Sequence, residues 1–388
     1  MNKKILLVDD EPQILRVLKA LFIKNGYKVF TASTADEALI LLATTPVQVI
    51  ISDYRMPKGT GAELLSKVKE FYPEIIRLIM SGYADFDVIE KSINEGSIFK
   101  FISKPWDNNS LLKTVEDALI YYADKNPSKC IISEGILVCD NDLELALDED
   151  QFLIYYQPII AMNTNQIVGA EALLRWQHPE KGLLFPSQFI KLCEDTKLII
   201  PIGLAALKKA CQQLKRWHQE GFTALNVAVN LSASQFNHPG LVDRIKDIIL
   251  ETKIPPQNLD LEITESVLIQ NGQNILQDLL ELKKLGIKLS LDDFGTGYSS
   301  LSYLSKFPIN SLKIDKSFIQ EIATNSKTLE IVTMTINLAK TLNLVTIAEG
   351  VETQLELELL KKMHCDLVQG YLFSKPVPDE EFHQLLNQ

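Results

Sequence analysis

Acidic residues that directly follow short apolar runs are the residues of this chain best suited to chemistry. In the N-terminal third, Asp9 and Asp10 follow the run Ile5–Val8, and Asp53 follows Val47–Ile51. Because strand ends converge on one edge of an open parallel sheet, we expect these three carboxylates to lie together. They would repel one another unless a hard cation such as Mg²⁺ joined them. Such an ion would also lower the cost of placing a phosphoryl group on Asp53.

A second, larger group of polar residues ends or interrupts the apolar runs of the remaining sequence. Its members are Glu171, Asn230, Glu262, Asp292, Asp293, Lys313, Glu349 and Gln369. Burying so many carboxylates together is prohibitive without cations. An all-oxygen ligand set favours Mg²⁺ or Mn²⁺ over zinc, and the tandem Asp292-Asp293 predicts two ions close together. A two-metal site is suited to phosphodiester hydrolysis, because the ions activate a water and stabilise the leaving oxygen.

Lys313 is the one cation of this second group. Its ammonium group is suited to orienting or deprotonating the attacking water, or to offsetting charge in the transition state. We therefore predict a catalytic role for it.

The elements that must position both groups are β/α units. Residues 1–123 alternate short apolar runs with segments of helical period, which predicts a parallel sheet with helices on both faces. The alternation resumes at residue 140 and continues to residue 388 with about eight strand candidates, which predicts a (β/α)₈ barrel. Residues 124–139 carry Asn, Pro, Ser and Gly without a clear period, and we interpret them as a linker.

Composition excludes several classes of protein. The net charge is −11 and no dense Lys/Arg run occurs, so a DNA-binding output has no support. No stretch approaches the length of a membrane span, and charge interrupts the first apolar run too early for a secretory signal. The five cysteines are scattered without a paired C-x-x-C spacing, which indicates structural thiols in a reducing compartment. We therefore expect a cytoplasmic protein.

The N-terminal motifs resemble the response-regulator receiver family across the first domain. The motifs are Asp9-Asp10, Asp53-x-x-Met56-Pro57-x-x-x-Gly61, Ser81-Gly82 and Phe101-x-x-Lys104-Pro105. The resemblance implies a flavodoxin-like, five-stranded sheet and a sensor histidine kinase or phosphotransfer protein as partner. For any one aspartate alone, helix capping is the competing interpretation.

By that resemblance each matching residue acquires a role. Asp53 is the phosphoacceptor, and Asp9, Asp10 and Asp53 hold one metal ion. Ser81 and Lys104 contact the phosphoryl group, while Phe101 is an aromatic switch. The Lys104-Pro105 peptide bond is expected to be cis.

The C-terminal strings EALLRW, DDFGTG, EGVE and QGY resemble the EAL family of cyclic di-GMP phosphodiesterases over residues 140–388. This resemblance implies a modified TIM barrel with one antiparallel strand. It also implies hydrolysis of cyclic di-GMP to linear pGpG with two Mg²⁺ or Mn²⁺ ions.

The same resemblance assigns a role to each candidate site residue of the barrel. It assigns Glu171, Asn230, Glu262 and Asp292 to the first metal, Asp292, Asp293 and Glu349 to the second, and catalysis to Lys313, Glu171 and Glu349. It makes Gln157, Arg175 and Gln369 substrate contacts, and it has Glu265 and Glu352 hold the metal-site loop and the lysine. For Glu265, a position near a helix start also fits a partner of the helix dipole.

Two functions from different classes remain open at this point. The first is a hydrolase controlled by phosphorylation of Asp53, and it is favoured because no matched position has lost its expected residue type. The second is a receptor that binds cyclic di-GMP without cleaving it and signals through a partner. Synthesis of cyclic di-GMP has no GGDEF-like motif to support it. Both families lead us to expect a homo-oligomer.

Overall fold

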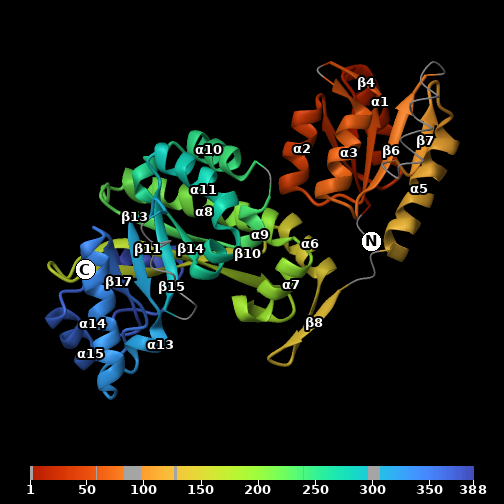
Figure 1. The fold of residues 1–388 in the computed structure, drawn as a ribbon. Helices are drawn as coiled ribbons and strands as arrows, with labels where there is room; N and C mark the ends of the chain where they lie inside the picture. The colour runs from red at the N-terminus through yellow and green to blue at the C-terminus, as the bar shows by residue number, and fades with distance from the viewer. Residues whose placement is uncertain (1–2, 58, 83–97, 126–128, 239, 296–305) are drawn as a thin grey trace. The chain divides into compact units, whose positions relative to one another are not determined.

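A computed structural model describes residues 3–57, 59–82, 98–125, 129–238, 240–295 and 306–388. The chain forms two compact units, Met1–Leu145 and Ala146–Gln388 (Figure 1). Each unit is described by itself below. Among the helices of the described ranges, none combines the length and the apolar content needed to cross a bilayer.

The N-terminal unit is built on a parallel sheet of the order β2-β1-β3-β6-β7. Its strands are β1 (Lys4–Val8), β2 (Lys28–Ala32), β3 (Val49–Asp53), β6 (Ile76–Ser81) and β7 (Lys100–Ser103), and a small hairpin is formed by β4 (Arg55–Met56) and β5 (Gly59–Thr60). Its described helices are α1 (Pro12–Lys24), α2 (Ala35–Thr44), α3 (Gly61–Phe71) and α5 (Asn108–Lys125).

Alternate residues of the buried strands point to opposite faces of this sheet, as strand geometry requires. In β1, Ile5 and Leu7 pack with α1 and α5, whereas Leu6 and Val8 pack with α2 and α3. The strands are buried on both faces and therefore read as continuous apolar runs. The predicted doubly wound fold is confirmed.

The segment that we interpreted as a linker contains a regular hairpin, β8 (Cys130–Ser133) and β9 (Ile136–Cys139), followed by α6 (Asp140–Asp148). The turn residues Glu134 and Gly135 both have positive φ, at 51° and 78°, as a two-residue hairpin turn requires.

This hairpin corrects our prediction for the cysteines. Cys130 and Cys139 face each other across the two strands and form a disulfide, so the prediction of free thiols is wrong for this pair. Their pairing depends on strand register, which spacing along the sequence does not reveal. The other three cysteines, Cys193, Cys211 and Cys365, are free and buried, as predicted.

The C-terminal unit is an eight-stranded closed barrel. Its strands are β10 (Phe152–Ala161), β11 (Ile167–His178), β13 (Asn226–Leu231), β14 (Leu259–Thr264), β15 (Lys288–Phe294), β16 (Ser311–Ile314), β17 (Val345–Ala348) and β18 (Leu367–Val368). Strand β10 is antiparallel to both of its neighbours, β11 and β18, and the remaining barrel pairs are parallel. The prediction of a TIM-type barrel with one antiparallel strand is confirmed. The short β12 (Gly182–Leu184) extends the sheet beside β11.

Helices cover the outside of the barrel, and their apolar faces explain why. In α8 (Ile199–Gln219), the buried residues Leu204, Leu207, Cys211 and Leu214 recur at helical spacing. The other long helices are α10 (Leu241–Thr252), α11 (Glu265–Lys284), α14 (Ser326–Thr341), α15 (Gln354–Lys362) and α16 (Asp379–Leu386). Shorter helices are α7 (Ile190–Asp195), α9 (Ala233–Phe236), α13 (Lys316–Ile319), η2 (Pro186–Gln188) and η3 (Pro256–Asn258).

Candidate functional site

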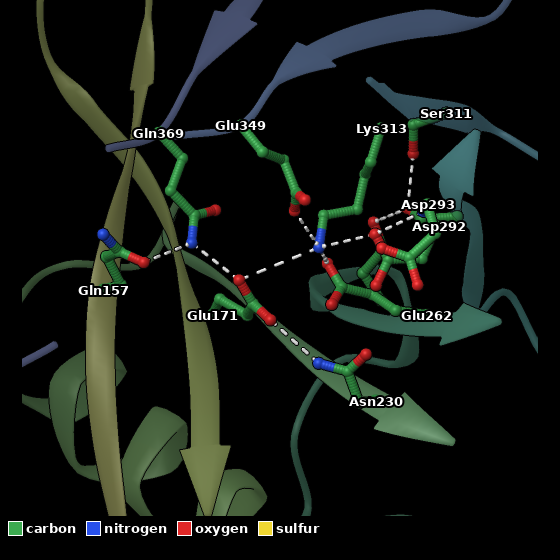
Figure 2. A network of polar contacts seen from close by, with 12 residues as sticks. Gln157, Glu171, Asn230, Glu262, Asp292, Asp293, Ser311, Lys313, Glu349 and Gln369 are labelled. Carbon is green, nitrogen blue, oxygen red and sulfur yellow. Dashed lines mark hydrogen bonds and ion pairs between the residues drawn. The ribbon is translucent and has the colours of Figure 1, made fainter. Parts of the chain in front are cut away.

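The carboxyl ends of the parallel barrel strands bring the predicted polar residues to one rim, where Figure 2 shows them converging. Strand register does this directly, because Asn230 on β13 lies opposite Glu262 on β14. The antiparallel strand β10 closes the barrel between β11 and β18, and we call this region the seam. There, Gln157 on β10 lies opposite Glu171 on β11. Residues separated by more than two hundred positions in sequence therefore share one site.

Lys313 lies at the centre of this rim and is fully buried (Figure 2). Its Nζ contacts four carboxylates. The distances are 2.6 Å to Glu349 Oε1, 2.8 Å to Glu262 Oε1, 3.3 Å to Asp292 Oδ1 and 3.7 Å to Glu171 Oε2. One ammonium group cannot balance four carboxylates, of which three are buried and that of Glu349 is half-buried, so the cluster lacks positive charge.

The pKa values of the cluster are shifted by burial and by this excess of negative charge. Burial alone would lower the pKa of Lys313, but the surrounding carboxylates raise it well above its usual value. Burial raises the pKa of Glu349 to about 8 and that of Glu262 well above its usual range, although Lys313 opposes both shifts. Burial also acts to raise the pKa of Glu171, but Lys313 and the Gln369 and Asn230 amides outweigh it and lower that pKa. Additional cations are needed before all these carboxylates ionise together.

The donor set fits hard divalent cations. Both carboxylate oxygens of Glu262 are buried, and Oε1 lies 2.8 Å from Lys313 Nζ. Asp292, Asp293 and Glu349 offer carboxylate oxygens that all lie within 4.8 Å of one another. Oxygen ligands without His or Cys are the set that Mg²⁺ and Mn²⁺ prefer. Asp292, Asp293 and Glu349 are therefore available as one group of candidate ligands at this rim.

Side-chain amides connect the two sides of the barrel seam. Gln369 Nε2 donates to Gln157 Oε1 at 2.8 Å and to Glu171 Oε2 at 2.6 Å. Asn230 Nδ2 donates to Glu171 Oε1 at 2.8 Å, and Gln157 Nε2 donates to the Ser374 carbonyl at 3.0 Å. Both oxygens of Glu171 are thus oriented by amides, which fixes its carboxylate toward the centre of the rim.

Arg175 lies four residues beyond Glu171 on β11 and faces the same side of the strand. Its guanidinium is stacked over the rings of Phe185, at 5.1 Å, and Tyr155, at 5.5 Å. Nη1 donates to the Leu174 carbonyl at 2.8 Å, while the buried Nε has no hydrogen-bond partner among the described residues. A guanidinium that is fixed by ring stacking and has an N–H donor available is suited to binding an anionic ligand.

The two glutamates predicted to support the site differ. Glu265 is buried at the start of α11 and accepts a hydrogen bond from the Gly295 amide at 3.3 Å, so it holds the chain just after Asp293. Glu352 is exposed and accepts a hydrogen bond from Gln320 at 3.4 Å. Among the described residues, the ion pairs of Lys313 are with the barrel carboxylates, so the role of Glu352 in holding this lysine stays a prediction.

A layer of polar residues directly below the rim was missed by the sequence reasoning. The Ser290 hydroxyl donates to Asp260 Oδ2 at 2.7 Å and lies 2.6 Å from the Ser311 hydroxyl. Each of these three residues lies two positions before a rim residue. Asp260 precedes Glu262, Ser290 precedes Asp292, and Ser311 precedes Lys313. A period of two places them on the same face of the strand, one layer down. That spacing was the available signal.

A second acidic site lies at the carboxyl edge of the N-terminal sheet. Lys104 Nζ contacts Asp9 Oδ2 at 2.9 Å and is also ion-paired with Asp53. Asp9 and Asp53 are buried and Asp10 is exposed. Burial raises the pKa of Asp53, while its hydrogen bond and ion pair with Lys104 oppose that shift. The three elements β1, β3 and β7 thus bring together residues that the sequence predicted to meet.

The remaining predicted residues of this edge lie as follows. Ser81 is buried at the end of β6, beside β3, and Phe101 on β7 is half-buried against the core face formed with α2 and α3. The Lys104-Pro105 bond is cis, as predicted.

Comparisons with known families agree with this architecture. The protein-family model of the EAL domain matches residues 140–376, and that of the response regulator receiver domain matches residues 5–116. Residues 117–139, including the disulfide-bonded hairpin, lie outside both matches.

Individual relatives resemble the barrel portion. The chain is 44% identical over 241 residues to the bifunctional diguanylate cyclase/cyclic di-GMP phosphodiesterase MucR of Pseudomonas aeruginosa, a match that covers 62% of this chain and 35% of MucR. It is 42% identical over 242 residues to the cyclic di-GMP phosphodiesterase NbdA of the same organism, covering 62% of this chain and 31% of NbdA. The chain thus spans about a third of the length of these curated relatives.

Solved structures give the same result. A structure described as the PaMucR phosphodiesterase in complex with c-di-GMP is 44% identical, with a TM-score of 0.61, and the match covers 62% of this chain and 98% of that one. The EAL enzyme Bd1971, in a form with cAMP and cyclic di-GMP bound, is 35% identical with a TM-score of 0.60, and the match covers 63% of this chain and 67% of that one.

Proposed function

Because the chain belongs to the EAL domain family, we propose that its barrel hydrolyses cyclic di-GMP to linear pGpG. The observation that carries the proposal is the rim itself, where one buried lysine contacts four carboxylates. The relatives MucR and NbdA, both described as cyclic di-GMP phosphodiesterases, support the choice of substrate.

The residues that would hold two Mg²⁺ or Mn²⁺ ions are those of the rim. We assign Glu171, Asn230, Glu262 and Asp292 to one ion, and Asp292, Asp293 and Glu349 to the other. When bound, the ions supply an activated water nucleophile and neutralise the leaving oxygen of an in-line displacement.

Lys313 and its neighbours carry the rest of the chemistry that we propose. Its ammonium group, held 2.6 Å from Glu349 Oε1, stays protonated and offsets negative charge that develops on the phosphate. Glu349, whose Oε1 lies beside Lys313 Nζ, would accept a proton once bound ions keep its carboxylate ionised. Glu171 is kept ionised and in one orientation by the Gln369 and Asn230 amides.

We assign substrate contacts to residues on the seam side of the rim. Arg175 offers its free Nε to a phosphate oxygen, since burial of that donor without a partner is costly in the absence of ligand. Gln157 and Gln369 form one amide pair that places a donor and an acceptor beside Glu171.

The test is conversion of cyclic di-GMP to pGpG by purified protein with Mg²⁺ or Mn²⁺, followed by chromatography. We expect turnover by the wild type and none by Glu171→Ala or after chelation of metal. Glu220→Ala, which changes an exposed glutamate at the end of α8, is the matched control. Tight binding of cyclic di-GMP without turnover by the wild type would contradict hydrolysis and indicate a receptor.

For the N-terminal unit we infer control by phosphorylation of Asp53, with one Mg²⁺ or Mn²⁺ held by Asp9, Asp10 and Asp53. The phosphodonor is a sensor histidine kinase or a phosphotransfer protein. The ion pairs of Lys104 with Asp9 and Asp53 support this, because the same ammonium group is placed to contact a phosphoryl oxygen on Asp53.

We further propose functional domains at residues 1–123 and 140–388, a cytoplasmic location and a homo-oligomer. Light scattering of the purified chain tests the oligomer, and a monomer at micromolar concentration would contradict it.

A further inference from the structure

The pair Cys130 and Cys139 is a feature that neither family match accounts for. The receiver match ends at residue 116 and the EAL match begins at residue 140, so the two cysteines belong to the segment between them. In that segment they are the cross-strand pair of hairpin β8–β9 that lies farthest from the turn.

The hairpin geometry brings the two sulfur atoms together without any rearrangement of the backbone. Cys130 and Cys139 are direct cross-strand partners, and their Cα atoms lie 4.1 Å apart. So short a separation is typical of the non-hydrogen-bonded position of an antiparallel pair, where side chains approach most closely.

Accessibility distinguishes this pair from the other thiols. Cys130 is exposed and Cys139 is partly exposed, whereas Cys193, Cys211 and Cys365 are buried. Burial raises the pKa of Cys211 to about 12 and that of Cys365 to about 11, so these thiols are poor nucleophiles. An oxidant in solution reaches the hairpin pair first.

The hairpin is tied to the helix that leads into the barrel. The Asp140 carboxylate accepts a hydrogen bond from the Lys129 amide at 3.1 Å, and the Asp142 carboxylate accepts one from the Cys139 amide at 3.1 Å. Both aspartates lie in the first turn of α6. Opening the hairpin beside Cys130 therefore removes contacts that fix the start of α6.

Helix α6 is also anchored to the sheet that carries Asp9. Glu144 Oε2 lies 3.8 Å from Nζ of Lys4, a fully buried lysine at the first position of β1. The same helix contains the point, between Leu145 and Ala146, at which the chain divides into its two units. The hairpin, the first part of α6 and β1 are thus connected within the N-terminal unit, which ends inside α6.

We propose that Cys130 and Cys139 are a reversible redox modification site whose state sets how strongly the N-terminal unit controls the barrel. The regulatory half of this inference rests on the proposed function. A two-stranded hairpin is marginally stable alone, and the bond at its open end keeps it closed. In a reducing compartment such bonds are transient and sense oxidants.

The chemistry uses a peroxide as oxidant. One cysteine thiolate attacks the peroxide O–O bond, forming a sulfenic acid and releasing hydroxide, which is protonated to water. The second thiol attacks the sulfenic sulfur, and a second water leaves as the disulfide forms. Overall, hydrogen peroxide and two thiols give one disulfide and two waters. A dithiol reductant reverses the change by thiol–disulfide exchange.

The first experiment measures the modification and does not depend on hydrolysis. Reduced full-length protein is treated with hydrogen peroxide, and peptides are mapped by mass spectrometry under non-reducing conditions. We expect a Cys130–Cys139 link to form before Cys193, Cys211 or Cys365 reacts, and to form equally in the control Cys365→Ser. Absence of the link, or earlier oxidation of a buried cysteine, would overturn the proposal.

The second experiment measures coupling. The ratio of pGpG formation by phosphorylated and unphosphorylated protein is compared after peroxide and after dithiothreitol, and we expect it to change about 5-fold or more. The Cys130→Ser/Cys139→Ser double variant should give one ratio under both conditions. An equal ratio in the oxidised and reduced wild type would overturn the regulatory role.

Amide hydrogen exchange separates failure of this inference from failure of the proposed function. If the barrel proves not to hydrolyse cyclic di-GMP, exchange in residues 130–148 still reports on the hairpin and α6. We expect faster exchange there after reduction of the wild type, with no such difference in the double variant. Identical exchange in both redox states would count against the proposal, whatever the barrel does.

Discussion

In the described part of the chain, a lysine lies among carboxylates at the edge of each of the two sheets, and the two lysines differ in their exposure. Lys104 contacts Asp9 and Asp53, and its side chain is 22% exposed. Lys313 contacts four carboxylates, and its side chain is fully buried. At the N-terminal site a partly exposed lysine faces two carboxylates, whereas at the barrel site a fully buried lysine faces four, so the barrel site is shorter of positive charge.

This difference indicates different uses of the same residue types. A partly exposed, open site can accept a covalent phosphoryl group and respond to its charge. A closed, acidic cluster is stable only when cations complete it, which suits permanent catalytic metals. Substituting the lysine or the acidic residues should therefore affect labelling, turnover and stability differently at the two sites.

The largest effect is expected at the open site. Asp53→Asn removes the carboxylate that would accept the phosphoryl group, so labelling by a small-molecule phosphodonor should fall to background. The unphosphorylated variant should keep wild-type hydrolysis of cyclic di-GMP. Mass spectrometry measures the labelling, and Asp36→Asn, at an exposed position of α2, is the matched control. Undiminished labelling of Asp53→Asn would show that another residue is phosphorylated.

The closed site should lose nearly all turnover without its lysine. Lys313→Ala removes the one ammonium group that, among the described residues, contacts the four carboxylates, and we expect turnover to fall by about 10³-fold. The metal-free variant should also unfold more readily, because buried carboxylates lose their partner. Steady-state kinetics and thermal unfolding measure the two effects. Lys327→Ala on the exposed start of α14 is the control, and near-normal turnover of Lys313→Ala would contradict the central role of the lysine.

Metal affinity should depend on pH at the closed site. Burial raises the pKa of Glu349 to about 8, and a metal ligand must be ionised, so binding releases a proton. Affinity for Mn²⁺ should rise by up to about tenfold per pH unit below pH 8 and then level off. The folding stability of the metal-free protein should change with pH in the opposite direction. It should fall as the pH rises from the unfolded pKa of Glu349 toward 8, because the folded state binds a proton more tightly there.

Titration calorimetry at pH 6, 7 and 8 measures this dependence. Glu349→Gln carries no ionisable group at that position, so its Mn²⁺ affinity should be weaker and should vary less with pH. The same steepness in the variant and the wild type would assign the titration to another group.

The smallest effect is expected one layer below the rim. Asp260→Asn keeps an oxygen that accepts the Ser290 hydrogen bond but removes a buried charge beneath Lys313, so we expect turnover to fall by only about 3- to 10-fold. Burial raises the pKa of Asp260 to about 6, so the wild type loses stability between its unfolded pKa and pH 6, and the variant should not. Kinetics and thermal melts at pH 5 and pH 7 measure both. A loss as large as that of Lys313→Ala would place Asp260 in the catalytic group itself.

Much of the architecture was predictable from the sequence, because apolar periodicity and short motifs report on local structure. The strand ends at Asp53, Asn230 and Lys313 were predicted from the runs that precede them, and the structure places each at the carboxyl edge of its sheet. Register along parallel strands then brings such positions together in almost any barrel or doubly wound sheet.

What the sequence could not provide depended on contacts between distant side chains. The Cys130–Cys139 bond follows from hairpin register, and the Asp260–Ser290–Ser311 layer follows from three strands meeting. The hydrogen bond of Glu352 with Gln320 was also not predictable, because a motif position says nothing of which way a side chain points. Sequence determined which residue types end each strand, since local propensity sets the elements, but only tertiary structure decided which neighbours each charge meets once water is excluded.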